Sequence, residues 1–529
     1  MRSQSPRTAI AIVLATALTI TGCTERYARD QSPTEFAHHG TRLESSGISE
    51  SLALPAVAPT GRLPDKLPPR PDADQLTTEI GLEPLRLGEV LASVEQTFPL
   101  LIAAEQEYAI AAGRRLAAEG AFDLNLRARG TTQDGTFPSD RFDFLAEQPT
   151  LYRGASLFGG YRFGFGDFPV YYGDRKTADG GEFRTGLAIP LLRDGSIDRR
   201  RATLRQTQLA ESLADPVVAR QRLDFLRAAS RAYWSWVAAG EQYRIAERLL
   251  DIARNRQQGL QKQFEEGQIA EFAVIDNRRL IVEREGLLIG AERRLQQTAF
   301  DLSLYLRDGE GNPIVPPSGR LPRDLQTVQL DAPATALAQA IETAWNNRPE
   351  LKRFAFLKEQ MAVELQLAEN QILPAVNLGL SGAQDVGASK SGTGSFQPDR
   401  TAAEASVLFD MPLQRRDARG KSDAASAALT QLTAQERFAR DQIMAEVQDV
   451  ASNLDRTFAR IERAREEQRI ATRVAELELE RFQKGQSTLL EVNLRELAAA
   501  GAQSKIVDAL ADFYRAQADY DAVIAARQR

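Results

Sequence analysis

The sequence is poor in the residue types that build disulfide frameworks and metal sites. Its 529 residues include one cysteine, Cys23, and two histidines, His38 and His39. One cysteine cannot form an intrachain disulfide, and no cysteine and histidine spacing suits a structural zinc site. We therefore expect neither a metal ion nor another cofactor.

The chain also lacks an excess of basic charge. It has 66 Lys and Arg against 72 Asp and Glu, a net charge of -6, and no basic cluster with interleaved aromatic residues. We therefore expect no nucleic-acid partner. Paired acids such as Glu265 and Glu266 lie on a predicted exposed helix, and no nucleophile, base and orienting group cluster in the sequence. We therefore expect no enzyme activity.

The N-terminus carries a targeting segment. Arg2 and Arg7 precede an apolar run over residues 8–20. This run is too short to cross a bilayer comfortably, which is typical of a signal peptide. We assign residues 1–22 to that peptide. Residues 23–84, which are rich in Ser, Pro and Gly, are expected to form an extended tether without a core.

The end of the apolar run resembles the bacterial lipobox. The residues Ile20-Thr21-Gly22-Cys23 carry this resemblance. It implies cleavage before Cys23, a diacylglycerol on the Cys23 thiol, and a mature protein anchored in the cell envelope. By the same resemblance, Thr24 directs the mature protein to the outer membrane, whereas an Asp at this position would not. A plain signal peptide followed by a coincidental cysteine is the alternative.

The longest periodic run of the chain covers residues 197–264 and is closed by Gly267. As one helix it would reach roughly 100 Å. Pro216 alone interrupts it, and polar Gln257 fills one position of an apolar heptad seam. The apolar seam residues are Ala246, Leu250, Ala253, Leu260 and Phe264. After the turn at Gly267, a second periodic run to about residue 306 is expected to return as an antiparallel hairpin.

The body of the chain is an internal duplication. The segment Phe264-Glu265-Glu266-Gly267-Gln268 is matched by Phe482-Gln483-Lys484-Gly485-Gln486, each at the end of a long helical run. Pro99-Leu100-Leu101 is echoed in the same way by Pro349-Glu350-Leu351. The first copy covers residues 85–308 and the second residues 336–529. The proline-rich segment 309–335 is expected to link them.

Each copy also has two short segments in which apolar and polar residues alternate. They lie near residues 122–127, 183–189, 376–380 and 403–409. We expect four main strands, each with one apolar face, as in outer-membrane barrels. Four strands cannot close a barrel, so copies must combine, and three copies would give about twelve strands. A small soluble sheet at the end of a coiled coil is the alternative. Residues 131–174, rich in Gly and aromatics, are expected to form an elaborated surface loop or an extra hairpin.

The order of these elements resembles the TolC-like outer-membrane efflux proteins, over about residues 85–523. The resemblance rests on the duplicated order of helix, strands and long hairpin, on the Pro-Leu segments and on the two Gly-Gln turns. The lipobox looks like that of the lipoprotein branch. The resemblance implies a mainly α fold with a membrane β-barrel portion, formed as a homotrimer with a twelve-stranded barrel and a periplasmic α-helical tunnel. It further implies a passive conduit for efflux or type I secretion, which engages a periplasmic adaptor protein and, through it, an inner-membrane transporter.

The resemblance also suggests gate and contact residues. The family's acidic gate position falls on Glu491, and three copies of Glu491 would form a cation-attracting ring. In the first copy that position is Ala273, and Asp276 lies nearly one turn further on as a substitute. The family's second acidic position falls on Leu494 and its basic position on Ser487, so this chain departs from the family's usual salt-bridge lock at both positions.

The turn residues are expected to contact the adaptor. They are Gly267, Gln268, Gly485 and Gln486. The competing interpretation of the whole chain is a lipid-anchored periplasmic coiled-coil scaffold, or an adaptor, without a pore.

Overall fold

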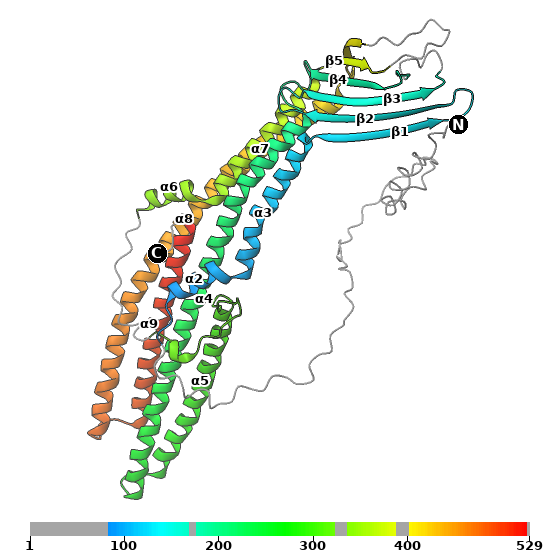
Figure 1. Ribbon diagram of the computed structural model, residues 1–529. Helices are drawn as coiled ribbons and strands as arrows, with labels where there is room; N and C mark the ends of the chain where they lie inside the picture. The colour runs from blue at the N-terminus through cyan, green and yellow to red at the C-terminus, as the bar shows by residue number, and fades with distance from the viewer. Residues whose placement is uncertain (1–82, 169–175, 323–335, 388–400, 526–529) are drawn as a thin grey trace, which may run out of the picture. The chain divides into compact units, whose positions relative to one another are not determined.

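The structure, a computed structural model, describes residues 83–168, 176–322, 336–387 and 401–525. The predicted signal peptide, Cys23 and all of the predicted tether except residues 83 and 84 lie outside these ranges. The described residues form a helical layer and one β-sheet (Figure 1).

The helices occur in the same order in both halves of the chain. Each half has a short helix, a helix that begins at a proline, and then a hairpin of two long helices. The first half contains α2 (Leu87–Thr97), α3 (Pro99–Glu119), α4 (Arg199–Glu265) and α5 (Glu271–Ser303). The second half contains α6 (Leu337–Asn347), α7 (Pro349–Ile372), α8 (Arg416–Gln483) and α9 (Leu489–Val523). Among the described helices, no single one is both long enough and apolar enough to cross a bilayer. Only the bent pair Leu87–Thr97 and Pro99–Phe122 meets both criteria, when its two members are taken together.

Helix α4 confirms the long helix predicted from the heptad pattern. It begins after Asp198, whose side chain accepts a hydrogen bond from the Arg201 backbone amide at 3.0 Å, and it continues through Pro216. Leu250, Ala253 and Leu260 of the predicted seam are buried, whereas Phe264 at the hairpin tip is exposed.

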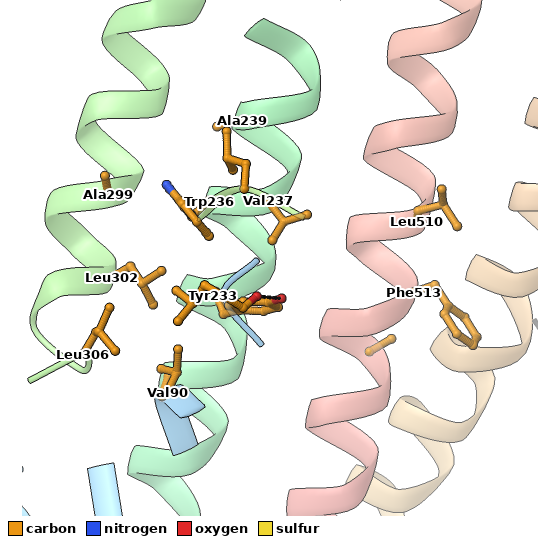
Figure 2. Close-up of a cluster of buried hydrophobic side chains, with 14 of the residues drawn as sticks. Val90, Tyr233, Trp236, Val237, Ala239, Ala299, Leu302, Leu306, Leu510 and Phe513 are labelled. Carbon is orange, nitrogen blue, oxygen red and sulfur yellow. Dashed lines mark hydrogen bonds between the residues drawn. The ribbon is translucent and has the colours of Figure 1, made fainter. Parts of the chain in front are cut away.

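The largest apolar core lies where α2 crosses the middle of α4. Trp236 on α4 is fully buried, and Tyr233 donates a hydrogen bond to the Leu85 carbonyl at 2.9 Å. Figure 2 shows side chains of this cluster from α2, α4, α5 and α9. They include Val90 of α2, Leu302 of α5, and Leu510 and Phe513 of α9. The core therefore joins the first hairpin to the second through α4 and α9.

The start of the linker packs against the same region. A Cβ atom on Gly240 of α4 would lie 2.4 Å from a Leu321 methyl group, so only glycine leaves room for Leu321. Leu321 is buried in the core cluster. Residues 309–322 are therefore attached to the helical layer.

The sheet has six antiparallel strands in sequential order, so the prediction of four strands is wrong. The strands are β1 (Asn125–Gln133), β2 (Ser139–Pro149), β3 (Ser156–Gly166), β4 (Glu182–Pro190), β5 (Ala375–Asp385) and β6 (Thr401–Asp410). The additional pair, β2 and β3, comes from the 131–174 segment, where one of the two expected outcomes was an extra hairpin. Its glycines hid the strand pattern, because glycine weakens strand propensity. The number of twelve strands in a trimer depended on four per chain and is revised below.

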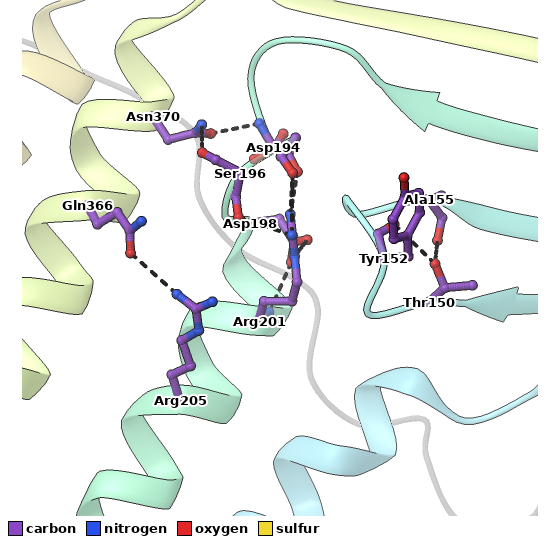
Figure 3. Close-up of polar contacts among 11 residues, drawn as sticks. Thr150, Tyr152, Ala155, Asp194, Ser196, Asp198, Arg201, Arg205, Gln366 and Asn370 are labelled. Atoms are coloured by element: carbon purple, nitrogen blue, oxygen red, sulfur yellow. Dashed lines mark hydrogen bonds and ion pairs between the residues drawn. The ribbon is translucent and has the colours of Figure 1, made fainter.

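The strands join the helices through a polar junction, drawn in Figure 3. Between β4 and α4, the Asp194 backbone amide donates to Asn370 of α7 at 2.7 Å, and Asn370 donates to the Ser196 hydroxyl at 2.8 Å. Arg201 forms a 2.6 Å ion pair with Asp198 and donates to the Asp194 carbonyl at 2.5 Å. These contacts fix the direction in which the chain leaves the sheet and enters α4.

Candidate functional site

The strand register gives the sheet one apolar face. Residues paired directly across antiparallel strands project to the same side of the sheet. The pairs Leu126–Ala146, Phe144–Tyr161 and Leu187–Leu380 therefore share a face. The remaining large apolar residues of that face are Phe142, Leu157, Phe163, Phe165, Phe183, Ile189, Val376, Leu378, Val407 and Phe409. Among the strand residues on this face, Asp140 is the only Asp, Glu, Lys or Arg.

The opposite face is polar and carries ion pairs between neighbouring strands. Arg127 of β1 lies 3.3 Å from Glu147 of β2, and Arg162 of β3 pairs with Glu182 of β4. The other charged residues on this face are Arg129, Arg141, Asp143, Arg184, Asp385, Glu404 and Asp410. A sheet with one apolar and one charged face can separate lipid from water.

Aromatic rings gather at one end of the apolar face. The Phe142 and Phe163 ring centroids are 5.0 Å apart, and those of Tyr161 and Phe183 are 4.9 Å apart. Phe142, Phe163 and Phe183 lie toward the strand ends remote from the helices, and Tyr161 is the middle residue of β3. A belt of aromatic residues in this position is typical of a membrane–water interface.

The two hairpin tips have the same backbone structure. The turn residues Gly267 and Gly485 have φ values of +73° and +71°. In the first turn, the Gly267 amide donates to the Phe264 carbonyl at 2.9 Å and the Gln268 amide to the Gln263 carbonyl at 2.8 Å. The second turn repeats both bonds, from Gly485 and Gln486, at 2.9 Å each. This hydrogen-bond pattern is a Schellman motif, which requires a left-handed residue and therefore favours glycine.

The four predicted contact residues at these tips are all exposed. A Cβ atom on either turn glycine would meet nothing within 4 Å. The Gln268 side chain donates to Glu266 at 2.7 Å, so it is held within its own turn. The surface around both glycines is therefore open to a partner.

Glu491 caps the start of α9. Its carboxylate accepts hydrogen bonds from the Ser487 hydroxyl at 2.9 Å and the Thr488 backbone amide at 3.3 Å, while the Thr488 hydroxyl accepts from the Glu491 amide. This capping box satisfies amides that the helix leaves free. The hydrogen bond from Ser487, followed by that from Thr488, lowers the pKa of the Glu491 carboxyl. The side chain is exposed and negatively charged at neutral pH.

Asp276 lies on α5 and is half-buried. It forms an ion pair with Arg279 of its own helix at 3.2 Å. Among the described residues, no hydrogen bond or ion pair joins Asp276 to Glu491. The two predicted gate acids lie on the second helices of different hairpins, α5 and α9.

A buried ionic cluster lies between the two hairpins, and the sequence analysis missed it. Glu496 of α9 lies 3.1 Å from Arg284 of α5 and also pairs with Arg256 of α4. The Arg284 side chain is 2% exposed and donates to the Leu249 carbonyl at 2.6 Å. Burial, which outweighs the attraction of Glu496, lowers the pKa of Arg284. The sequence carried one indication of this ionic cluster, because Arg256 lies next to the polar seam residue Gln257.

That polar seam residue has its own buried partner. The Asn277 side-chain amide of α5 donates to the Gln257 side chain at 2.8 Å and to the Ala253 carbonyl at 3.0 Å. A single polar pair inside a coiled coil fixes the register of the two helices at some cost in stability. The pair therefore fixes which residues of α5 lie beside which residues of α4.

Both layers have edges that this single chain leaves open. Every residue of β1 and of β6 is exposed, whereas most residues of β2 to β5 are half-buried. In the helical layer, α4 packs against α5 and α9, and α9 packs against α8, so α5 and α8 are outermost (Figure 1). Large apolar residues at heptad spacing are exposed on both outer helices. They are Ile275, Val282 and Ile289 on α5, and Ile470, Val474 and Leu477 on α8.

Solved structures share this architecture. The CmeC outer membrane channel of Campylobacter jejuni matches with a TM-score of 0.57 and 11% identity, over 83% of this chain and 85% of that chain. The outer membrane protein VceC of Vibrio cholerae matches with a TM-score of 0.57 and 15% identity, over 83% and 95%. The MtrE outer membrane channel of Neisseria gonorrhoeae matches with a TM-score of 0.58 and 14% identity, over 83% and 89%. This chain has the TolC-like fold.

The TolC-like fold was recognised through structure. Neither a protein-family model nor a curated protein sequence matches the chain. The similar structures are channels and other membrane proteins.

Proposed function

We propose that this chain is the outer-membrane channel of a tripartite efflux or type I secretion system. It would act as a passive conduit for cargo delivered by an inner-membrane transporter and a periplasmic adaptor protein. The observation that supports this most strongly is the sheet, which has one apolar and one charged face and two open edges, attached to a layer of long helices.

The open edges favour assembly from identical copies. Unpaired backbone groups at a sheet edge cannot remain in lipid, since no water is available to satisfy them. Strand β1 leads away from the helices and β6 leads back toward them, so β6 of one copy and β1 of the next run antiparallel. The exposed apolar residues at heptad spacing on α5 and α8 are available for contact with the same neighbouring copies, because these two helices form the outer sides of the helical layer. We propose a homotrimer, in which the sheets close a barrel and the helices close a tunnel.

The sheet faces suggest how the barrel sits in the outer membrane. The apolar face would contact lipid and the charged face would line a water-filled lumen. The clustered rings of Phe142, Phe163 and Phe183 would lie at the interface remote from the helices. The helical tunnel would then extend into the periplasm.

The hairpin tips are the proposed contact with the adaptor. Gly267 and Gln268 in one turn, and Gly485 and Gln486 in the other, present similar backbone structures that one type of adaptor hairpin would recognise. Glu491, next to the second turn, is proposed as the acidic ring at the constriction. Asp276 is the weaker candidate, since Arg279 already neutralises it.

We also propose that the mature chain is anchored by lipid on Cys23. This proposal rests on the resemblance of residues 20–23 to a lipobox. The anchor is not required for a pore, because the sheet supplies its own lipid-facing surface.

Conductance separates this function from a scaffold or adaptor without a pore. Purified full-length protein, reconstituted in planar lipid bilayers, is expected to give stepwise ionic currents. As a matched control, the same preparation is heated until its oligomer dissociates, and the currents should disappear. An oligomer that stays intact in the bilayer and passes no current would exclude the channel function.

A further inference from the structure

The two halves of the chain contribute different numbers of strands to one sheet. In the second half, β5 follows α7 and leads directly to β6 and α8. In the first half, β1 follows α3 in the same way, and β4 leads to α4, but β2 and β3 lie between them. The second half therefore serves as an internal reference, and the extra pair is β2 and β3.

The extra pair is fully integrated between its neighbours. All nine residues of β1 pair with β2, and seven residues of β3 pair with β4. The Arg127–Glu147 ion pair joins β1 to β2 on the polar face, and Arg162–Glu182 joins β3 to β4 on the same face. These contacts connect both outer sides of the hairpin.

A glycine and an aromatic ring also join β3 to β4. Phe158 pairs with Gly186, and its ring covers the glycine so closely that an added Cβ would lie 2.3 Å from it. An aromatic side chain over a cross-strand glycine is a common way to hold strand register. The hairpin is therefore held to its neighbour by packing as well as by hydrogen bonds.

The extra strands have the length and the two faces of the others. Strands β2 and β3 contain 11 residues each, like β5. Transmembrane strands need about 9 to 11 residues. The apolar face continues across them through Phe142, Phe144, Leu157 and Tyr161, and the charged face through Asp143. A hairpin folded away from the membrane would have no use for an apolar face in register with β1 and β4.

We propose that β2 and β3 are part of the membrane wall, so that three copies of six strands close an eighteen-stranded barrel. This inference rests on the proposed function and replaces the expected number of twelve. An even number of strands per copy keeps the pairing between β6 and the next β1 antiparallel. With strands about 4.8 Å apart and tilted by about 45°, the backbone radius would rise from about 13 Å for twelve strands to about 20 Å for eighteen. Within the membrane, the lumen would be wider and lined by more charged residues than the lumen of a barrel with four strands per copy.

Cysteine labelling of two strands tests where the hairpin lies. On β2, Phe144→Cys lies on the apolar face and Asp143→Cys on the polar face. Leu380→Cys, on the apolar face, and Ser381→Cys, on the polar face, form the matched control pair on β5. Strand β5 is a suitable control because it has a counterpart in the first half, whereas β2 has none in the second. Each full-length variant is reconstituted in vesicles and treated with a bilayer-dissolved maleimide or with a charged, water-soluble one. Unsubstituted protein gives the background from Cys23.

The expected result is the same alternation on both strands. Phe144→Cys and Leu380→Cys should react at least tenfold faster with the bilayer-dissolved reagent than the Asp143→Cys and Ser381→Cys variants do, and the water-soluble reagent should show the reverse order. If the β5 pair alternates and Phe144→Cys reacts with the water-soluble reagent, the hairpin lies outside the wall and this inference is wrong, while the channel survives. If the β5 pair also fails to alternate, the proposed barrel itself is wrong.

Direct counting completes the test. Native mass spectrometry gives the number of copies, and electron cryo-microscopy of the same sample in nanodiscs gives the number of strands around the wall. Three copies with eighteen strands support the inference. Twelve strands from three copies would overturn it, because β2 and β3 would then lie outside the wall. Twelve strands from two copies would keep β2 and β3 in the wall but overturn the eighteen-stranded barrel of three copies.

Discussion

Arg284 of α5 and Glu496 of α9 form an ion pair of 3.1 Å that connects the two long hairpins near their tips. Arg256 of α4 binds the other carboxylate oxygen, so one glutamate holds two arginines from the neighbouring hairpin. In the proposed channel, opening the tips requires the hairpins to move apart. This cluster is therefore placed where it would resist opening.

Glu496→Gln is expected to loosen the tips. The substitution leaves Arg256 and Arg284 without their countercharge, and losing one partner of a buried ion pair costs about 3 kcal/mol. Hydrogen exchange of the first turns of α9 should quicken and the channel should open more often. Glu467→Gln is the matched control, because the Glu467–Lys505 pair is exposed and worth at most about 1 kcal/mol. Equal effects of the two substitutions would contradict this role.

Gly485→Ala and Gly267→Ala are each expected to destabilise their turn by about 1 kcal/mol. Alanine disfavours the left-handed conformation that both glycines adopt. Gly259→Ala is the opposite control, because Gly259 lies inside α4 with nothing within 4 Å of the new methyl group. It should stabilise the helix by about 0.5 to 1 kcal/mol. Thermal unfolding of the three variants measures the difference, and a loss of stability in the Gly259 variant would refute the explanation.

Glu491→Gln is expected to reduce cation selectivity in single-channel recordings. In unsubstituted protein the selectivity should persist to a pH below the ordinary glutamate range, because hydrogen bonds from Ser487 and Thr488 lower the pKa of Glu491. The charge, and the capping that depends on it, is present above the ordinary pKa and lost as the pH falls through the lowered one. Ser487→Ala should move the loss of selectivity to a higher pH. If the Glu491→Gln variant kept its cation selectivity unchanged, Glu491 would not lie at the constriction.

Opposite charges on the open sheet edges are expected to pair between copies. Arg129 on β1 and Glu404 on β6 lie on the polar face, and neither has an ion-pair partner among the residues that the structure describes. Arg129→Glu should make the oligomer dissociate in detergent at a lower temperature. Adding Glu404→Arg should restore part of the loss, since the reversed charges again attract. A double variant as unstable as the sum of the two single variants would argue against contact between these edges.

Cys23→Ala is expected to abolish metabolic labelling with palmitate while leaving conductance intact. The thiol of Cys23 is the proposed lipid attachment site, whereas the pore depends on the sheet. Incorporation of label into the Cys23→Ala variant would show that the lipobox interpretation is wrong. Loss of both label and insertion would show that the anchor is needed for assembly.

The long hairpins and their turns could be predicted from the sequence because their determinants are local. A heptad seam that includes Leu250 and Leu260, followed by Gly267, specifies a helix and its end within a few residues of chain. The second turn at Gly485 repeats the same signal, which revealed the duplication. The tether, the signal peptide and Cys23 remain predictions, since they lie outside the described residues.

The extra strands and the ionic cluster could not be predicted in the same way. Glycines in β3 have low strand propensity, and their place in the sheet depends on pairing with β2 and β4. Arg284 and Glu496 are 212 positions apart, so neither residue indicates the other.

The sequence by itself therefore determined the repeated helices, the positions of the turns and the alternation of most strands, because each follows from side chains a few residues apart. Only the tertiary structure decided that the sheet has six strands with continuous apolar and charged faces, and that Glu496 holds two arginines between hairpins. These features arise from contacts between distant segments, whose register is fixed only when the whole chain has folded.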